Sequence, residues 1–271
     1  MSIVSPRSPG APPQTGVRKF MPRKLAPTNV AEPENAANLS TQRSDATPSK
    51  GHRKEKPDSI QGELMKMALR ACLIARDATF NVQDLLTNSS RMAFLAIRDC
   101  EKELDQIERR IDDQLPGAIT RVNERKARQL LACLKCITDL ERIGDLVMGV
   151  AQRVQTRSGQ LPGSDVRHLV QMSAILHDML QDIHRGFVSL DIENARKVLR
   201  IDSELDRICH DLFQRHLADN TRERNSLGFD VLLMAQALER AGDHAKNLAE
   251  ELYSLIEGRT LRHLPKRTAA Q

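Results

Sequence analysis

The sequence predicts an all-α protein made of two tandem, pseudo-repeated three-helix bundles. Three observations lead to this fold class. Helix-forming Leu, Ala, Met, Arg and Glu dominate residues 57–258, and strand-like alternation of polar and apolar residues is absent. After Pro57, prolines in that stretch are limited to Pro116 and Pro162. Two segments also recur in the same order at nearly one spacing, which indicates an internal duplication.

Turn-forming residues delimit the first three helices. The first helix is expected from Pro57 to the polar break Asn88-Ser-Ser, where the second begins. Two positions compete for the next reversal, the turn signal Leu115-Pro-Gly117 and the later Val122-Asn-Glu-Arg. A reversal at Pro116 would place the acidic motifs described below out of register by about 13 residues, or roughly 20 Å of helix. We therefore expect Pro116 to kink or start a helical turn, and the third helix to follow the later break.

Similar breaks delimit the second half. The segment from Ser158-Gly to Gly163-Ser connects the halves, and the fourth helix extends to Ser189-Leu-Asp. The fifth helix reaches Ala218-Asp-Asn, and the sixth follows the polar run that ends at Ser226. The expected domains are a disordered, basic, Pro-rich extension (1–57), the first bundle (58–158), the second bundle (159–258) and a basic tail (259–271).

Positive charge is concentrated at the two ends of the chain. The formal net charge is +5, yet residues 57–258 hold 27 basic and 32 acidic residues. Residues 1–56 contain ten Lys or Arg against four Asp or Glu, and nine of the twelve prolines lie in residues 6–57. The whole chain has only six Phe and one Tyr, and the helical region offers no aromatic platform for stacking bases. We therefore expect no nucleic-acid partner.

Compartment and cysteine chemistry follow from the same composition. The first residues lack the apolar run of a secretory signal, and no stretch approaches the roughly 18 apolar residues of a membrane span, so a cytoplasmic protein is expected. Cys133-Leu-Lys-Cys136 has metal-site spacing, but no second pair completes a four-ligand set. Reduced thiols in the core are expected for all five cysteines, Cys72, Cys100, Cys133, Cys136 and Cys209.

Four copies of an acid-x-x-x-Asp pattern carry the main functional signal. On a helix, side chains at i and i+4 project from one face, roughly 5 to 6 Å apart at Cβ. Like charges in that arrangement repel, so each pair lowers stability unless a cation, a basic side chain or water compensates. A reversal at Asn123, and another between Arg222 and Glu223, would bring four carboxylates together in each half. The pairs are Glu101 with Asp105, Glu141 with Asp145, Asp202 with Asp206, and Glu239 with Asp243.

Such oxygen-rich groups suit Fe, Mn, Mg or Zn and leave the choice of metal open. Gly144 and Gly242 add to the signal, because Gly inside a helix costs about 1 kcal/mol relative to Ala. Their expected role is to let a neighbouring helix approach closely. His244 adjoins Asp243, but sequence neighbours point about 100° apart on a helix, and we expect His244 on the surface. The acids are expected near the bundle surface, beside the core stripes Cys136, Leu140, Ile143, Val147, Val150 and Leu238, Ala241, Ala245, Leu248, Leu252.

At these residues the sequence resembles the PhoU family of phosphate-uptake regulators. The hallmark of that family is a repeated helix carrying Leu-Glu-Arg-x-Gly-Asp-x-x-x-Asn-x-x-Glu. The segment from Leu238 to Glu250 matches it throughout, while the copy that starts at Leu140 matches through Asp145 and then departs. Met148-Gly149 stands there in place of Lys246-Asn247. The first half is therefore expected to hold the less complete site.

The resemblance covers about residues 57–258 and implies a function without catalysis. PhoU-like proteins hold metal clusters, mostly of iron or zinc, on their acid-x-x-x-Asp motifs. They restrain the phosphate-starvation response when phosphate is plentiful, by contact with the phosphate ABC transporter and a membrane sensor histidine kinase, commonly as homodimers. Two alternatives stay open. One is a metal-free helical interaction module of the same fold, and the other is a carboxylate-bridged di-iron enzyme, although the sequence lacks the Glu-x-x-His motif of that class.

Overall fold

A computed structural model describes residues 57–157, 161–218 and 222–258, and every element in these ranges is an α-helix. The prediction of an all-α fold with six helices is confirmed. The predicted basic tail, and the predicted extension up to residue 56, lie outside the described residues. No helix of the described residues combines the length and the apolar character needed to cross a membrane. The helices are α1 (Pro57–Asn88), α2 (Arg91–Ile119), α3 (Glu124–Thr156), α4 (Gly163–Ser189), α5 (Ile192–Ala218) and α6 (Arg222–Glu257).

The breaks between helices carry the polar groups that cap helix ends. The Ser90 hydroxyl accepts a hydrogen bond from the Ala93 N–H at the start of α2 (3.2 Å). The Asn123 side chain accepts one from the Lys126 N–H at the start of α3 (3.0 Å). These bonds satisfy N–H groups that have no partner inside the helix, which explains why α2 and α3 begin where they do.

The chain reverses between α2 and α3 over residues 120–123, so the prediction of a late reversal is confirmed. Pro116 lies inside α2, which continues to Ile119. Asn123 then caps α3. Pro116 has no N–H to donate to the Asp112 carbonyl, so α2 continues past it with one hydrogen bond fewer. The late reversal keeps the acidic motifs of α2 and α3 in register.

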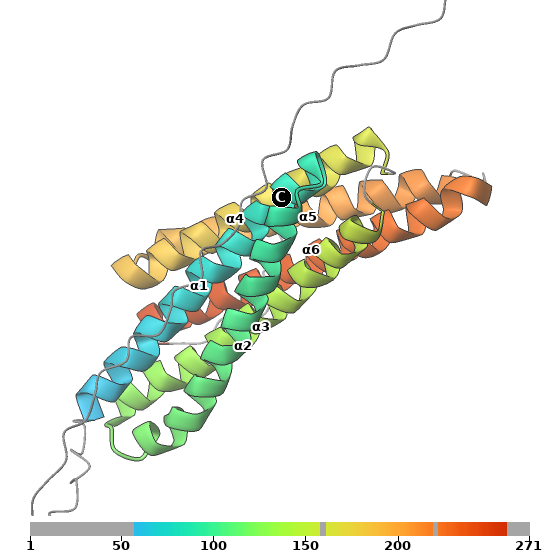
Figure 1. Cartoon of the computed structure of the whole chain (residues 1–271). Helices are drawn as coiled ribbons and strands as arrows, with labels where there is room; N and C mark the ends of the chain where they lie inside the picture. Colours follow the sequence, from blue (N-terminus) through green and yellow to red (C-terminus); the bar gives the residue numbers. More distant parts are fainter. Residues whose placement is uncertain (1–56, 158–160, 219–221, 259–271) are drawn as a thin grey trace, which may run out of the picture. The chain divides into compact units, whose positions relative to one another are not determined.

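The helices form two three-helix bundles that are joined along two helix pairs (Figure 1). Helices α1, α2 and α3 pack against one another, as do α4, α5 and α6. Helix α1 also packs on α4, and α3 packs on α6. Among the described helices, α2 and α5 contact only members of their own bundle. The duplication seen in the sequence is therefore a structural duplication, with α1, α3, α4 and α6 forming the junction.

The core follows the two predicted stripes, and both are confirmed. Every member of the two stripes is at most 5% exposed. Buried polar groups tie the bundles together as well. The Ser173 hydroxyl on α4 donates to the Thr79 carbonyl on α1 at 2.7 Å, and both side chains are fully buried. Burial of apolar side chains supplies the main stabilisation, and such satisfied polar contacts add specificity.

Charged side chains link α3 to α6 near both ends of their contact. The Arg157 Nε lies 2.7 Å from the Asp230 carboxylate. The Lys135 Nζ lies 3.1 Å from the Glu251 carboxylate. Because α3 and α6 run antiparallel, these two ion pairs lie at opposite ends of the contact between the two helices.

All five cysteines are free, as predicted. Four are buried and Cys100 is half-buried. The Cys133 thiol donates to the Leu64 carbonyl at 3.4 Å, within the core. Burial raises the pKa of the Cys133 thiol to about 12, so this thiol stays protonated at neutral pH. The Cys133-Leu-Lys-Cys136 motif is therefore core packing, as the sequence indicated.

Gly144 and Gly242 each let a neighbouring helix approach closely, as predicted. A Cβ added at Gly144 would lie 2.6 Å from Cδ1 of Leu104 on α2. A Cβ at Gly242 would collide in the same way with Leu205 on α5. Both leucines are 1% exposed, so they are part of the buried core. Each glycine therefore lets a leucine of the preceding helix pack directly against the backbone.

This packing predicts opposite effects for two Gly→Ala substitutions. Gly144→Ala should lower the free energy of unfolding by about 1–3 kcal/mol, because the added methyl group overpacks a filled contact. Gly62→Ala is the matched control, since Gly62 is exposed on α1 with no atom within 4 Å of its added Cβ. It should raise stability by up to about 1 kcal/mol through helix propensity. Urea unfolding measures both variants, and equal stability of the two would contradict the close approach.

Candidate metal centres on two carboxylate clusters

Helices α2 and α3 bring together the first carboxylate cluster, which consists of Glu101, Asp105, Glu141 and Asp145. Each helix contributes an i, i+4 pair, so each pair lies on one face. The charges act on each other across the helix pair. Burial, followed by the charges of Asp105 and Asp145, raises the pKa of Glu101. The structure therefore gathers the four residues that the sequence singled out in the first half.

Helices α5 and α6 bring together the second carboxylate cluster, which consists of Asp202, Asp206, Glu239 and Asp243. Burial, followed by the charges of Asp243, Asp206 and Asp202, raises the pKa of Glu239. Burial, followed by Asp202 and Asp243, raises the pKa of Asp206. The four carboxylates of the second half thus also act on one another across a helix pair.

The clusters lie on the faces of the bundles, with one exception. Three of the acids are exposed, namely Asp145, Asp206 and Asp243. Four are half-buried, namely Glu101, Asp105, Glu141 and Glu239. Asp202 is only 5% exposed, so the expectation that all the acids lie near the surface is wrong at this position. A buried carboxylate requires a partner, because an unpaired charge away from water is costly.

Glu141 is the most strongly perturbed carboxyl group of the first carboxylate cluster. Burial raises its pKa most, the charges of Asp145 and Glu108 raise it further, and Arg142 lowers it. The result is a pKa of about 7. Near neutral pH this group is therefore divided between its acid and carboxylate forms, and a bound cation would displace the proton.

Glu108 on α2 adjoins the first carboxylate cluster and was missed by the sequence analysis. Burial, followed by the charges of Asp112 and, more weakly, Asp105 and Asp145, raises its pKa, while Arg142 lowers it. The signal was present, because residues 101, 105 and 108 follow the i, i+4, i+7 pattern of one helix face. The acid-x-x-x-Asp pattern does not include this third acid on the same face of α2.

Lys246 on α6 is the second residue that the sequence analysis missed. Its ammonium group forms an ion pair with the buried Asp202 carboxylate on α5. The hydrogen bond to Asp202 raises the pKa of Lys246, and the charges of Asp243 and Asp206 act in the same direction. Lys246 is therefore the partner that the buried Asp202 requires, and it introduces a positive charge into the second carboxylate cluster.

The carboxylates are not arranged as a closed coordination shell. Within the described parts of the chain, no group of three or more His, Cys, Asp or Glu side chains is placed so that it could hold a metal ion. The donor chemistry does suit a divalent cation, because each cluster offers carboxylate oxygens whose mutual repulsion a cation would relieve. Metal ligation by the eight acids thus stays a prediction, and it requires their side chains to close around the ion.

His244 is half-buried and contacts the other bundle, so the expected surface position is met only in part. Its Nδ1 lies 2.8 Å from the Asp139 carboxylate on α3, and its side chain is 25% exposed. The Asn247 amide donates to the same carboxylate at 3.3 Å. His244 and Asn247 therefore connect α6 to α3 and are directed away from the second carboxylate cluster.

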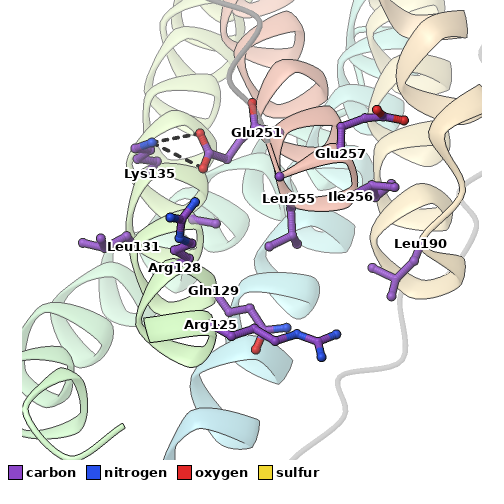
Figure 2. A pocket seen from close by; sticks show the side chains of 13 residues that line it. Arg125, Arg128, Gln129, Leu131, Lys135, Leu190, Glu251, Leu255, Ile256 and Glu257 are labelled. Atoms are coloured by element: carbon purple, nitrogen blue, oxygen red, sulfur yellow. Dashed lines mark hydrogen bonds and ion pairs between the residues drawn. The ribbon is translucent and has the colours of Figure 1, made fainter. Parts of the chain in front are cut away.

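A groove of about 580 Å³ lies between the first half of α3 and the C-terminal end of α6. Figure 2 shows Lys135 facing Glu251 at the groove, with Arg128 nearer to the N-terminal end of α3. Arg128 pairs with Glu124 at 2.7 Å, so charges of both signs are paired around the groove. Apolar Leu190 borders it as well. The groove shares no lining residue with either carboxylate cluster and does not favour a ligand of one charge.

The PhoU domain family matches this chain twice, over residues 68–154 and residues 169–252. The first match covers most of α1, α2 and α3, and the second covers most of α4, α5 and α6. Each half of the duplication therefore carries its own match.

Relatives with this domain span the same part of the chain. A Burkholderia sp. protein named phosphate-specific transport system accessory protein PhoU homolog is 31% identical over 79% of this chain and 92% of its own length. A Thermotoga maritima protein named PhoU homolog 1 of the same system is 26% identical over 75% and 88%. The crystal structure of PhoU from Pseudomonas aeruginosa aligns with a TM-score of 0.68 at 23% identity, over 75% of this chain and 100% of that one. The last likeness supports the fold.

The raised pKa of Glu141 predicts that stability falls as the pH rises. The folded-state pKa of about 7 lies above the ordinary 4.5, so between these values the folded chain holds a proton that the unfolded chain has lost. The proton-linked stabilisation is complete below pH 4.5 and is lost as the pH rises through 7. Allowing for solvent screening, the loss should be about 1–2 kcal/mol.

Urea unfolding of the metal-free protein at pH 5 and pH 8 measures this loss. Glu141→Gln cannot titrate and should show a smaller fall than the wild type. Glu239→Gln is the matched control in the second carboxylate cluster, where the shift is smaller. An equal fall in the wild type and in Glu141→Gln would contradict the assignment to Glu141.

Proposed function

Because this chain belongs to the PhoU family, we propose that it is a cytoplasmic regulator of phosphate uptake. It restrains the phosphate-starvation response when phosphate is ample. It acts by contact with the phosphate ABC transporter and its sensor histidine kinase. The observation that carries this proposal is the match of both halves to the PhoU domain, supported by relatives named as accessory proteins of phosphate-specific transport systems.

In this proposal the chain performs no catalytic step. Its acidic groups lie on helix faces that a partner surface can reach, which suits regulation by contact. A homodimer is the proposed working form. Steering by the acidic faces would favour basic partner surfaces and would weaken as the ionic strength rises.

The carboxylate clusters are the proposed metal centres, with iron or zinc as the expected metal and manganese or magnesium as alternatives. Burial raises the pKa of Glu101, Glu141 and Glu239 most, and repulsion from neighbouring acids, which a cation would relieve, raises it further. Its chemical role would be to neutralise and order the acidic face. The proposed ligands are Glu101, Asp105, Glu141 and Asp145 in the first cluster, and Asp202, Asp206, Glu239 and Asp243 in the second.

A second candidate is a metal-free interaction module of the same fold. The ion pair between Lys246 and Asp202 favours it, because part of the second carboxylate cluster is already neutralised from within the chain. In that function, exposed acids such as Asp145 and Asp243 bind basic patches on a partner directly. The two candidates differ in whether the purified chain carries metal.

Metal content separates these candidates. The chain purified without a metal-binding tag should carry metal by mass spectrometry. A variant combining Glu141→Ala, Asp145→Ala, Glu239→Ala and Asp243→Ala should lose most of it. Lys135→Ala controls for removal of a surface charge outside both clusters. A folded wild-type chain without metal would reject the metal centres and favour partner docking by the acids.

The regulatory proposal is tested in the native host. Deletion of the gene should leave the phosphate-starvation response switched on in phosphate-rich medium, as measured with a reporter of that response. The wild-type gene supplied in trans should restore repression. Normal repression in the deletion strain would reject the proposed function whatever the metal content.

A further inference from the structure

The two carboxylate clusters differ in charge at two equivalent positions. The repeat offset of 98 residues between α3 and α6 places Met148 where Lys246 stands. The offset of 101 residues between α2 and α5 places Glu108 where Cys209 stands. The first carboxylate cluster therefore has an additional acid beside it and lacks the lysine.

Lys246 is placed as an internal counter-ion. It reaches from α6 to Asp202 on α5, whose side chain is 6% exposed. Asp206 and Asp243 also attract its charge. The Lys246 side chain is 39% exposed, so the pair is partly buried, and removal of Lys246 would leave the buried Asp202 charge poorly solvated.

The first carboxylate cluster has only outer counter-charges. Arg142 lies 3.6 Å from Glu141 and 3.3 Å from Asp145, with a side chain that is 59% exposed. Arg109 lies 3.2 Å from Asp105, with a side chain that is 75% exposed. Such exposed pairs are weak because solvent screens them. Met148 contributes no charge, so the repulsion within this cluster is not relieved from inside the protein.

We propose that Lys246 competes with a divalent cation for the second carboxylate cluster, so that the first carboxylate cluster binds a divalent cation more tightly than the second. This inference rests on the proposed cation binding by both clusters. A cation that binds Asp202 competes with the ammonium group of Lys246, whereas Met148 at the equivalent position of the first cluster offers no competing charge. The motif copy that departs from the family pattern at Met148 is thus the better cation site.

Reciprocal substitutions test the proposal, with Mn²⁺ alone as the probe and the full chain stripped of metal. A background of Glu141→Gln with Asp145→Asn leaves the second cluster as the site under study. In it, Lys246→Met should tighten Mn²⁺ binding by about tenfold or more. A background of Glu239→Gln with Asp243→Asn leaves the first cluster. In it, Met148→Lys should weaken Mn²⁺ binding by about tenfold or more.

Titration calorimetry gives the affinities, and circular dichroism shows that each variant is folded. Lys135→Met is the matched control, because it removes an ammonium group that pairs with Glu251 outside both clusters. It should leave the affinities unchanged. Because the two swaps act on different helices, a failure of one variant to fold leaves the other as a test.

The outcomes distinguish this inference from the function on which it rests. Unchanged affinity in the folded swap variants, with Mn²⁺ still bound, would overturn the role of Lys246 and leave the metal centres intact. A wild-type chain and a Lys246→Met variant that both fail to bind Mn²⁺ would overturn the metal centres and this inference together. Tighter binding in Lys246→Met and weaker binding in Met148→Lys support it.

Discussion

The close approach of two antiparallel helix pairs, α2 with α3 and α5 with α6, is the constraint on which the rest of the structure depends. At each crossing a buried leucine, Leu104 or Leu205, packs where Gly144 or Gly242 lacks a side chain. Each leucine lies between the two acids of its motif. The contact that stabilises the helix pair therefore also sets how closely the carboxylates face each other. Apolar burial is strong enough to hold like charges together.

The repulsion created by this packing is relieved differently in the two halves. In the first half, burial and neighbouring acids raise the pKa of Glu141 to about 7. Protonation of Glu141 therefore relieves part of the repulsion there. In the second half, Lys246 pairs with Asp202 inside the cluster. The two halves thus share one packing solution but have distinct charge states. A duplicated fold can diverge in this way because surface charges change more freely than core contacts do.

Features that depend on local periodicity could be predicted from the sequence. The helices, the core stripes, the late reversal at Asn123 and the roles of Gly144 and Gly242 all follow from helix geometry and the duplication. The ion pair of Lys246 with Asp202 and the contact of His244 with Asp139 could not. They join different helices through Lys246 and His244, whose equivalent positions in the first half hold Met148 and Leu146, so neither periodicity nor the repeat indicates them.

One turn of α6 connects the second carboxylate cluster to the other bundle. Lys246 contacts Asp202 on α5, whereas His244 and Asn247 contact Asp139 on α3. Asp139 in turn lies two residues before Glu141 of the first cluster. A helical turn is stiff, because each of its backbone hydrogen bonds spans four residues. The contacts of α6 with α5 and with α3 therefore lie within one turn of the same helix.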